Sequence, residues 1–145
     1  MTGTDDTKAF LDSNIVLYLL SANTAKADRA ESLLKLRPTI SVQVLNEVTN
    51  VCIRKLRMSW RETEQFADLL FSFCRVVPLT VDVHQLARRI AKRHGLAFYD
   101  ACIVAAASIE SCETLYTEDM QHGLIIEDAL VLLNPFVQMR GCGSG

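Results

Sequence analysis

The sequence has no long apolar run and lacks the glycine-rich motifs of nucleotide-binding loops. Its longest apolar stretches, such as Ala101 to Ala107, are far shorter than the roughly 18 to 20 residues that a membrane-spanning helix requires. Its six glycines are scattered, and there is no phosphate-binding loop, dinucleotide-binding fingerprint or serine-nucleophile signature. We therefore expect a soluble globular protein that makes no membrane contact and does not use these motifs.

Metal-binding motifs of cysteine and histidine are also missing. The three histidines share no ligand spacing with one another or with a cysteine, which argues against a zinc site. The cysteines are odd in number and show no CxxC spacing, which predicts reduced, mostly buried thiols instead of a disulfide framework. They are Cys52, Cys74, Cys102, Cys112 and Cys142. The first residues, MTGTDDT, contain no secretory signal, so we expect a cytoplasmic location.

Positive and negative charges nearly balance, with 15 Lys and Arg against 17 Asp and Glu and a net charge of −2. The surface as a whole offers no strong field for nucleic acid, so such a partner requires a local basic patch or a bound cation. Basic residues cluster at 54–57 and at 88–94. In the second cluster the pairs Arg88/Lys92 and Arg89/Arg93 have helical spacing and form one face. That face is either simply solvated or a track for a phosphate backbone.

Short apolar runs alternate with amphipathic stretches along the 145 residues, a length that suits one domain. Predicted strands are 8–12, 39–42, 75–80 and 114–117, followed by a short final pair; predicted helices are 15–20, 25–36, 42–57, 60–74, 81–94 and 98–111. Predicted helix signals are N-caps at Thr24 and Ser41, a capping box of Ser59 and Glu62, and a left-handed terminator at Gly95. Strands separated by helices predict an α/β fold, a three-layer α/β/α sandwich with a mainly parallel central sheet.

Four acidic residues lie where the local pattern predicts burial or the end of a buried strand: Asp12, Glu47, Asp100 and Asp119. Each has an ordinary explanation when taken alone. Asp12 suits a helix cap, and Asp119 suits a turn. Glu47 lies in the apolar stripe of a helix, where an Arg or Lys partner would explain it, and Asp100 suits the helix dipole. The neighbouring Glu118 we expect to face solvent.

The interpretation depends on whether these carboxylates converge. Two like charges about 5 Å apart repel by roughly 3 kcal/mol at an effective dielectric of about 20, so four clustered carboxylates require protons or a cation. Ligands of open parallel sheets bind at the carboxyl ends of strands, where Asp12 lies. Oxygen ligands favour a hard cation such as Mg²⁺ or Mn²⁺, which activates a water and neutralises a phosphate. The four acids therefore predict a metal-dependent phosphodiesterase.

The motifs around these acids are LDSN at Asp12, LNEV at Glu47, YDACIVAAA at Asp100 and LYTEDMQHG at Asp119, and NPF follows near the end. Together they resemble the PIN-domain nucleases, and most of all the VapC-type toxins of bacterial toxin–antitoxin pairs. The resemblance covers residues 8–136, which we expect to form one PIN-like, Rossmann-like nuclease domain. We expect residues 1–7 to be a flexible N-terminus and residues 137–145 a flexible tail, either native or left by cloning.

The resemblance implies specific roles for the four acids. Asp12 and Asp100 correspond to the principal ligands of Mg²⁺, with Mn²⁺ as a substitute, and Asp119 lies beside them. Glu47 completes the catalytic set, either directly or by orienting the water. Two further residues fall where the family places polar support, Asn14 and Thr117.

The resemblance further implies an endoribonuclease that cuts cellular RNA and arrests growth, a cognate antitoxin that inserts a peptide near the active site, and a homodimer. One alternative is a PIN-like nuclease of RNA processing or repair that has no antitoxin. Another is a receiver-like, Mg²⁺-binding signalling domain without enzymatic activity. Such a domain needs an Asp ending its third strand and a Lys ending its fifth. Here Pro78, Leu79 and Thr80 lie at the end of the third strand, and Arg140 is the only Lys or Arg after Asp119.

Overall fold

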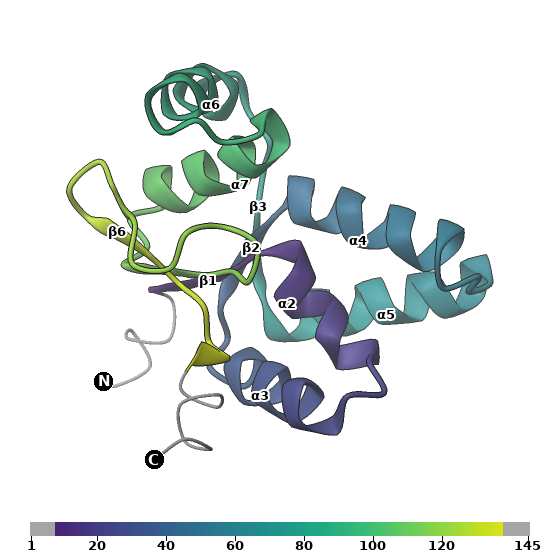
Figure 1. The fold of residues 1–145 in the computed structure, drawn as a ribbon. Helices are drawn as coiled ribbons and strands as arrows, with labels where there is room; N and C mark the ends of the chain where they lie inside the picture. The colour runs from purple at the N-terminus through teal and green to yellow at the C-terminus, as the bar shows by residue number, and fades with distance from the viewer. Residues whose placement is uncertain (1–7, 138–145) are drawn as a thin grey trace, which may run out of the picture.

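A six-stranded sheet forms the centre of the computed structural model, which describes residues 8–137 (Figure 1). The strand order is β3-β2-β1-β4-β6-β5. Neighbouring strands are parallel except for β5 and β6, which pair in antiparallel orientation at one edge. The strands are β1 (Ala9–Leu11), β2 (Thr39–Ser41), β3 (Arg75–Val77), β4 (Thr114–Tyr116), β5 (Ile125–Ile126) and β6 (Leu130–Leu133). The predicted α/β fold with a mainly parallel sheet is confirmed.

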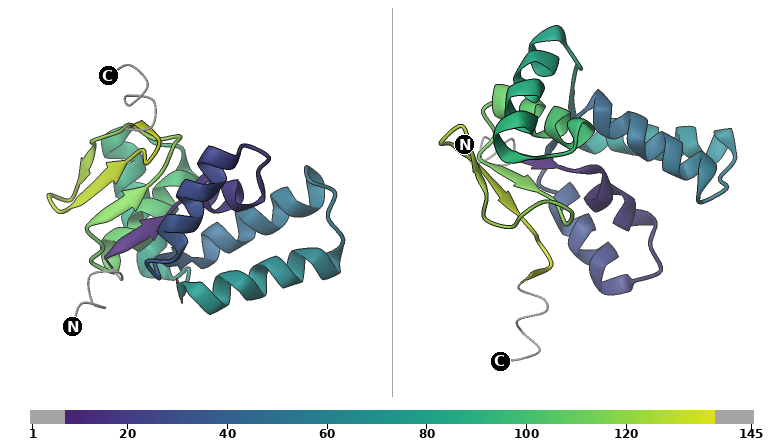
Figure 2. Two further views of the ribbon diagram at one scale, coloured as in Figure 1. Left: turned by 90° about the horizontal axis from the view of Figure 1, so that it is seen from below. Right: turned by 45° about the horizontal axis from the view of Figure 1, so that its top comes forward.

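Helices flank this sheet on both faces. They are α2 (Ser13–Leu17), the 3₁₀ helix η1 (Tyr18–Leu20), α3 (Thr24–Leu34), α4 (Val42–Arg54), α5 (Trp60–Phe73), α6 (Val81–His94) and α7 (Phe98–Ile109). In Figure 1, α6 and α7 lie above the sheet and α3 lies below it. Helices α4 and α5 extend side by side away from the sheet, as both views of Figure 2 also show. The layers are those of the predicted α/β/α sandwich.

The chain changes direction at the centre of the sheet. From β1 it passes outward to β2 and β3, and it then returns over α6 and α7 to β4, on the other side of β1. Because the connections after β1 and β4 leave in opposite directions, the carboxyl ends of these two strands form the switch point of the sheet, which is where the ligand crevice of open parallel sheets lies. In their register Leu11 lies opposite Tyr116, and the Asp12 N–H donates to the Tyr116 carbonyl at 3.0 Å. Asp12 and Thr117 therefore emerge side by side at the crevice.

Helix α7 forms much of the core. Residues 101–107 of this helix are all buried, because α7 packs against α6 and against β2. Their side chains are mostly small, which lets the helix approach its neighbours closely. Phe10, Ile40 and Leu115, one from each of three central strands, are fully buried in the same core. The prediction that this apolar helix is buried nearly all round is confirmed for residues 101–107, whereas Phe98, Tyr99 and Ile109 at its two ends are exposed.

The helix signals of the sequence are mostly found in the structure. The confirmed signals are the Ser41 cap, the Ser59–Glu62 capping box and Gly95, which ends α6 in the left-handed conformation with φ 69°. The predicted cap at Thr24 is wrong, because the side chain of Asn23 accepts the Lys26 N–H at 3.2 Å and Thr24 is already helical. The strand predicted over 75–80 ends at Val77, directly before Pro78, which has no N–H to donate to a neighbouring strand.

The thiols are buried, as predicted. Within residues 8–137 the cysteines form no disulfide, and burial raises the pKa of all of them, to about 12 for Cys74 and about 11 for Cys112. They stay protonated at neutral pH. In the same part of the chain, no helix is both long and apolar enough to cross a bilayer. Cys142, the predicted flexible N-terminus and all but the first residue of the predicted tail lie outside the described residues.

Candidate active site

Asp12 lies at the carboxyl end of β1 and is 3% exposed. Its Oδ1 accepts the Ser13 N–H at 2.7 Å, so Asp12 does cap α2, as one interpretation of the sequence predicted. Its Oδ2 accepts hydrogen bonds from the Thr117 hydroxyl at 2.7 Å and from the Asn14 amide at 3.3 Å. Asn14 and Thr117 therefore contact the acid beside which the resemblance placed them. The cap uses Oδ1, and the hydrogen bonds of Thr117 and Asn14 orient Oδ2.

Burial raises the pKa of the Asp12 carboxyl from 3.8 to about 7. The charges of Asp100 and Glu47 raise it further, whereas the hydrogen bonds from Thr117 and Ser13 act in the opposite direction. Near neutral pH the Asp12 carboxyl is therefore present in both its neutral and its charged form. A positive charge brought into the crevice stabilises the charged form.

Glu47 projects from α4 and is half-buried. Its Oε1 accepts the Ser13 hydroxyl at 2.6 Å, and its Oε2 accepts the Gln43 amide at 3.0 Å. No Lys or Arg within residues 8–137 forms an ion pair with it, so the ordinary explanation offered by the sequence does not apply to the described part of the chain. Two neutral donors hold this carboxylate in place and leave its charge uncompensated.

Asp100 and Asp119 complete the set of acids. Asp100 stands half-buried in the first turn of α7, and its pKa is raised by burial, then by the charge of Glu47 and then by that of Asp119. Asp119 is exposed in the loop after β4, where its N–H donates to the Thr117 hydroxyl oxygen at 3.3 Å. Thr117 thus links the backbone of this loop to Asp12.

The four acids, far apart in the sequence, lie around one region of the molecule. Asp12 interacts electrostatically with Asp100 and Glu47, and Asp100 interacts with Glu47 and Asp119. Each acid comes from a different segment, namely β1, α4, α7 and the loop after β4. Asp12 and Asp119 follow β1 and β4 directly, so these two lie at the carboxyl edge of the sheet. The tertiary structure therefore produces the convergence on which the sequence interpretation depended.

The donors at this crevice fit a hard divalent cation. They are carboxylate oxygens, supported by hydroxyl and amide groups, and no Lys or Arg in the described part of the chain pairs with the four acids. In residues 8–137, no three Asp, Glu, His or Cys side chains are grouped so closely that they would hold a metal by themselves. Mg²⁺ usually binds through one or two carboxylates and keeps several waters, so this looser arrangement suits it better than Zn²⁺.

Glu118 does not face solvent, contrary to the prediction. Its carboxylate accepts a hydrogen bond from the Tyr18 hydroxyl and forms an ion pair with Lys26. This contact raises the pKa of both Tyr18 and Lys26. The Glu118 N–H donates to the Asn14 side-chain oxygen at 3.3 Å. Glu118 therefore anchors the loop after β4 to η1 and α3, and its charge is compensated, unlike that of Asp119.

Sequence analysis missed the donors that hold Glu47. Gln43 lies four residues before Glu47 on α4, a spacing at which side chains on a helix contact each other. The sequence therefore contained enough information to predict this hydrogen bond. Ser13 stands next to Asp12 in the LDSN motif, but only the packing of α2 against α4 brings its hydroxyl to Glu47. The second contact could not be predicted from spacing.

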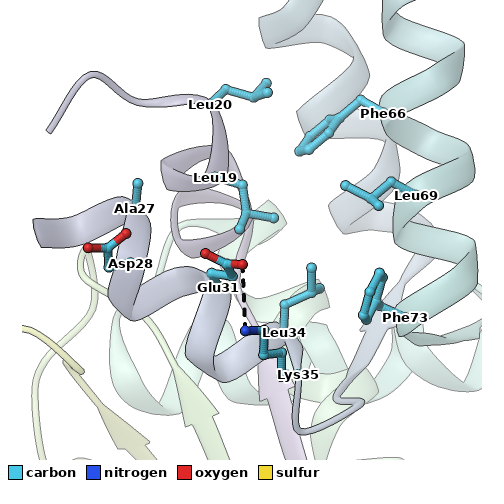
Figure 3. A pocket seen from close by; sticks show the side chains of 10 residues that line it. All are labelled: Leu19, Leu20, Ala27, Asp28, Glu31, Leu34, Lys35, Phe66, Leu69 and Phe73. Carbon is cyan, nitrogen blue, oxygen red and sulfur yellow. Dashed lines mark ion pairs between the residues drawn. The ribbon is translucent and has the colours of Figure 1, made fainter. Parts of the chain in front are cut away.

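An apolar groove of about 310 Å³ lies among η1, α3 and α5 (Figure 3). Its apolar lining residues are Leu19, Leu20, Leu34, Phe66, Leu69 and Phe73. Figure 3 shows the Phe66, Leu69 and Phe73 side chains of α5 facing those of η1 and α3, with the ion pair of Glu31 and Lys35 at the rim. None of the four acids lines this groove. Sequence analysis did not identify it.

The protein belongs to the α/β class, with a mainly parallel sheet and acidic residues that follow its central strands. The sequence pattern of the PIN domain matches residues 9–123, and the chain belongs to the PIN domain family. No protein of curated function matches the sequence significantly.

Solved structures share this fold. A toxin–antitoxin complex from Klebsiella pneumoniae has a TM-score of 0.67 at 20% identity and covers 88% of this chain and 97% of its own. VapC20 from Mycobacterium tuberculosis, a toxin that cleaves the sarcin–ricin loop, has a TM-score of 0.61 at 23% identity, with 77% and 89% covered. VapBC2 from Rickettsia felis, bound to a DNA fragment from its promoter, has a TM-score of 0.61 at 19% identity, with 87% and 98% covered. At these identities the likeness concerns the fold.

Proposed function

We propose that this protein is a divalent-metal-dependent endoribonuclease and the toxin of a toxin–antitoxin pair that acts in the cytoplasm. One observation carries the proposal: four carboxylates from separate segments interact electrostatically with one another, and within residues 8–137 no Lys or Arg forms an ion pair with them. Such a charge cluster is costly unless it binds a cation. Membership of the PIN domain family supports the same chemistry.

In this mechanism Asp12 and Asp100 would be the principal ligands of the cation, Mg²⁺ or Mn²⁺, with Asp119 beside them, and waters would complete its coordination. When bound, the cation supplies an activated water and neutralises charge on the scissile phosphate. Thr117 and the Ser13 N–H keep the Asp12 carboxylate oriented and favour its charged form.

Glu47 supports the reaction from α4. Ser13 and Gln43 donate hydrogen bonds to both of its oxygens, so the carboxylate has a defined position. From there it orients the attacking water and takes its proton. Hydrolysis of this kind does not require a 2′-hydroxyl, so the acids themselves do not select RNA over DNA. The choice of RNA rests on the family resemblance and on the sarcin–ricin loop cleavage of VapC20.

The proposed partner is a cognate antitoxin, and the proposed assembly is a homodimer. One of the solved structures that share the fold is a toxin–antitoxin complex, and another is VapBC2 bound to a DNA fragment from its promoter. The apolar groove among η1, α3 and α5 has the lining that an amphipathic segment of a partner requires. Size-exclusion chromatography with light scattering measures the oligomeric state. Tight co-purification with the product of an adjacent small gene tests the antitoxin, and its absence favours the alternative of an RNA-processing nuclease.

The nuclease proposal is tested with purified protein, a mixed pool of RNA and the matching DNA, with Mg²⁺, with Mn²⁺ and with EDTA. We expect cleavage of RNA that requires the metal and falls at least about 100-fold in Asp12→Ala and Asp100→Asn. Asp68→Asn, which changes an exposed acid of α5 away from the crevice, is the matched control and keeps full activity. Circular dichroism checks folding. Undiminished cleavage in the two active-site variants would refute the proposal.

A further inference from the structure

Two exposed aromatic rings lie in the same helical turn as Asp100. Phe98 and Tyr99 begin α7 and are 37% and 65% exposed, and the next residue is Asp100. The ring of His84, on the exposed side of α6, meets Phe98 edge to face at 5.3 Å, and Phe98 lies 5.9 Å from Tyr99. These three rings form a continuous surface, which we call the ring platform.

A cationic face continues from the ring platform along α6. His84, Arg88 and Lys92 follow one another at four-residue spacing, so they share a side of the helix over about 12 Å. Arg88 and Lys92, together with Gln85 and Arg89, line a shallow hollow of about 490 Å³. Within residues 8–137 none of these basic side chains forms an ion pair with a carboxylate. Their charge is therefore available to a polyanion.

The core does not account for these exposed rings and charges. The buried side of α6 is formed by Val83, Leu86, Ala87 and Ile90. The core side of α7 begins after Asp100, at residue 101. Tyr99, which precedes these buried residues in α7, is more than half exposed. A large apolar surface that is left in solvent next to a catalytic crevice is typical of a binding site.

We propose that the ring platform stacks an unpaired nucleobase next to the scissile phosphate, and that Arg88 and Lys92 bind the phosphates beyond it. Single-stranded nucleic acid is bound by this combination of aromatic faces and a cationic track. Two observations favour this occupant over a protein: the track complements a polyanion, and the rings of Phe98 and Tyr99 share the first turn of α7 with Asp100. The inference rests on the proposed nuclease function and makes Tyr99 a substrate-positioning residue.

The test measures binding and cleavage separately. Binding uses a single-stranded RNA of about ten nucleotides that carries the fluorescent base 2-aminopurine, whose emission is quenched by stacking. The Asp12→Asn background prevents cleavage during the measurement. Tyr99→Ala, Tyr99→Leu and Tyr99→Phe are compared in this background, and Phe71→Ala, which removes another exposed ring on α5, is the matched control.

We expect Tyr99→Ala and Tyr99→Leu to bind about 5- to 100-fold more weakly and to lose the quenching, while Tyr99→Phe restores both because it keeps the ring. With Asp12 intact, Tyr99→Ala raises KM for short RNA more than it lowers kcat. Arg88→Ala and Lys92→Ala weaken binding and reduce its dependence on salt. The control Arg61→Ala, an exposed residue of α5, changes neither quantity.

Two results would overturn the proposal. One is unchanged RNA binding, quenching and KM in Tyr99→Ala while the unsubstituted protein cleaves RNA, which leaves the nuclease function intact and removes only the platform. The other is an altered oligomeric state or antitoxin affinity of Tyr99→Ala with RNA binding retained, which assigns the rings to a protein interface. If the unsubstituted protein neither binds nor cleaves RNA, both proposals fail together.

Discussion

The hydroxyl of Thr117 donates a hydrogen bond to Oδ2 of Asp12 at 2.7 Å, and this contact joins the carboxyl ends of β1 and β4. Both side chains are buried. A hydrogen bond to a charged group contributes about 1.5–3 kcal/mol, and here it also favours the ionised form of Asp12. The contact therefore couples the topology of the sheet to the charge state of the central acid.

Replacement of Thr117 by Val removes this hydrogen bond and raises the pKa of Asp12 further. We expect kcat/KM for RNA cleavage at neutral pH to fall about 10-fold, and the acidic limb of its pH profile to move to higher pH. Thr117→Ser keeps the hydroxyl and is the control. A Thr117→Val profile that coincides with that of the unsubstituted protein would contradict the role given to this contact.

The stability of the metal-free protein should depend on the titration of Asp12. Its pKa is about 7 in the folded state and near 3.8 in the unfolded chain, so the folded protein binds more protons between these values. The contribution of Asp12 to the free energy of unfolding is then greatest below about pH 4 and falls as pH rises to about 7, by at most about 4 kcal/mol. Urea denaturation in EDTA at several pH values measures this slope.

Asp12→Asn supplies the matched variant, because it cannot ionise. We expect it to flatten the slope and to be more stable than the unsubstituted metal-free protein at pH 8. The raised pKa of Asp100 contributes in the same direction, so Asp100→Asn should flatten the slope further. A difference in stability between Asp12→Asn and the unsubstituted metal-free protein that stays constant between about pH 4 and pH 7 would contradict the raised pKa of Asp12.

Divalent cations should stabilise the folded protein through the four acids. At a concentration about 100 times the dissociation constant, Mg²⁺ adds about 2.7 kcal/mol, which corresponds to a rise in Tm of about 5–10 °C for a chain of this size. The rise should be lost in Asp12→Asn and in Asp100→Asn and retained in Asp68→Asn. Thermal denaturation measures the Tm in Mg²⁺ and, for comparison, in NaCl of equal ionic strength. Equal rises in all variants would place the cation elsewhere.

Glu118 and Asp119 are neighbours that should respond differently to substitution. Glu118→Gln leaves the partly buried Lys26 without its anionic partner, so we expect a loss of about 1–2 kcal/mol in stability and cleavage within about threefold of normal. Asp119→Asn changes an exposed acid and should lower cleavage at least about 10-fold with little change in stability. Denaturant titration measures the stability of both variants, and cleavage assays measure their activity. A loss of activity in Glu118→Gln and a loss of stability in Asp119→Asn would contradict the structural role given to Glu118 and the catalytic role given to Asp119.

The apolar groove gives a test of the proposed antitoxin that is independent of catalysis. Leu69 is 41% exposed on the groove side of α5, and a glutamate there puts a charge on an apolar contact surface. We expect Leu69→Glu to weaken antitoxin binding at least about 10-fold, as measured by calorimetry, and to leave RNA cleavage unchanged. Arg61→Glu, an exposed position of the same helix outside the groove, is the control. Equal affinity in both variants would place the antitoxin elsewhere.

Local chemistry made several elements predictable from the sequence. The capping box at Ser59 and Glu62 and the left-handed Gly95 depend on neighbouring residues alone, and the structure contains both. The apolar run after Asp100 predicted a helix buried all round, and it lies between α6 and the sheet. The cap of α3 was misplaced by one residue, because Asn23 and Thr24 are both good caps and adjacent.

Contacts between distant segments could not be predicted in this way. Ser13 reaches Glu47 only because α2 packs against α4. Glu118 looked like a surface residue because its partners, Tyr18 and Lys26, are about a hundred positions away in the chain. The apolar groove has the same origin, since its two sides belong to η1 and α3 on one hand and α5 on the other.

The sequence by itself determined which acids this protein has, the type of strand or helix that carries each, and the family pattern they form. Those properties depend on local propensity and on the order of motifs along the chain. Only the tertiary structure decided how the acids differ. Burial and the register of β1 against β4 give Asp12 a pKa of about 7 and a hydrogen bond from Thr117, whereas Asp119 remains exposed and Glu118 is paired with Lys26. Charge state and solvent exposure depend on what surrounds a side chain in space, and the chain order does not contain that information.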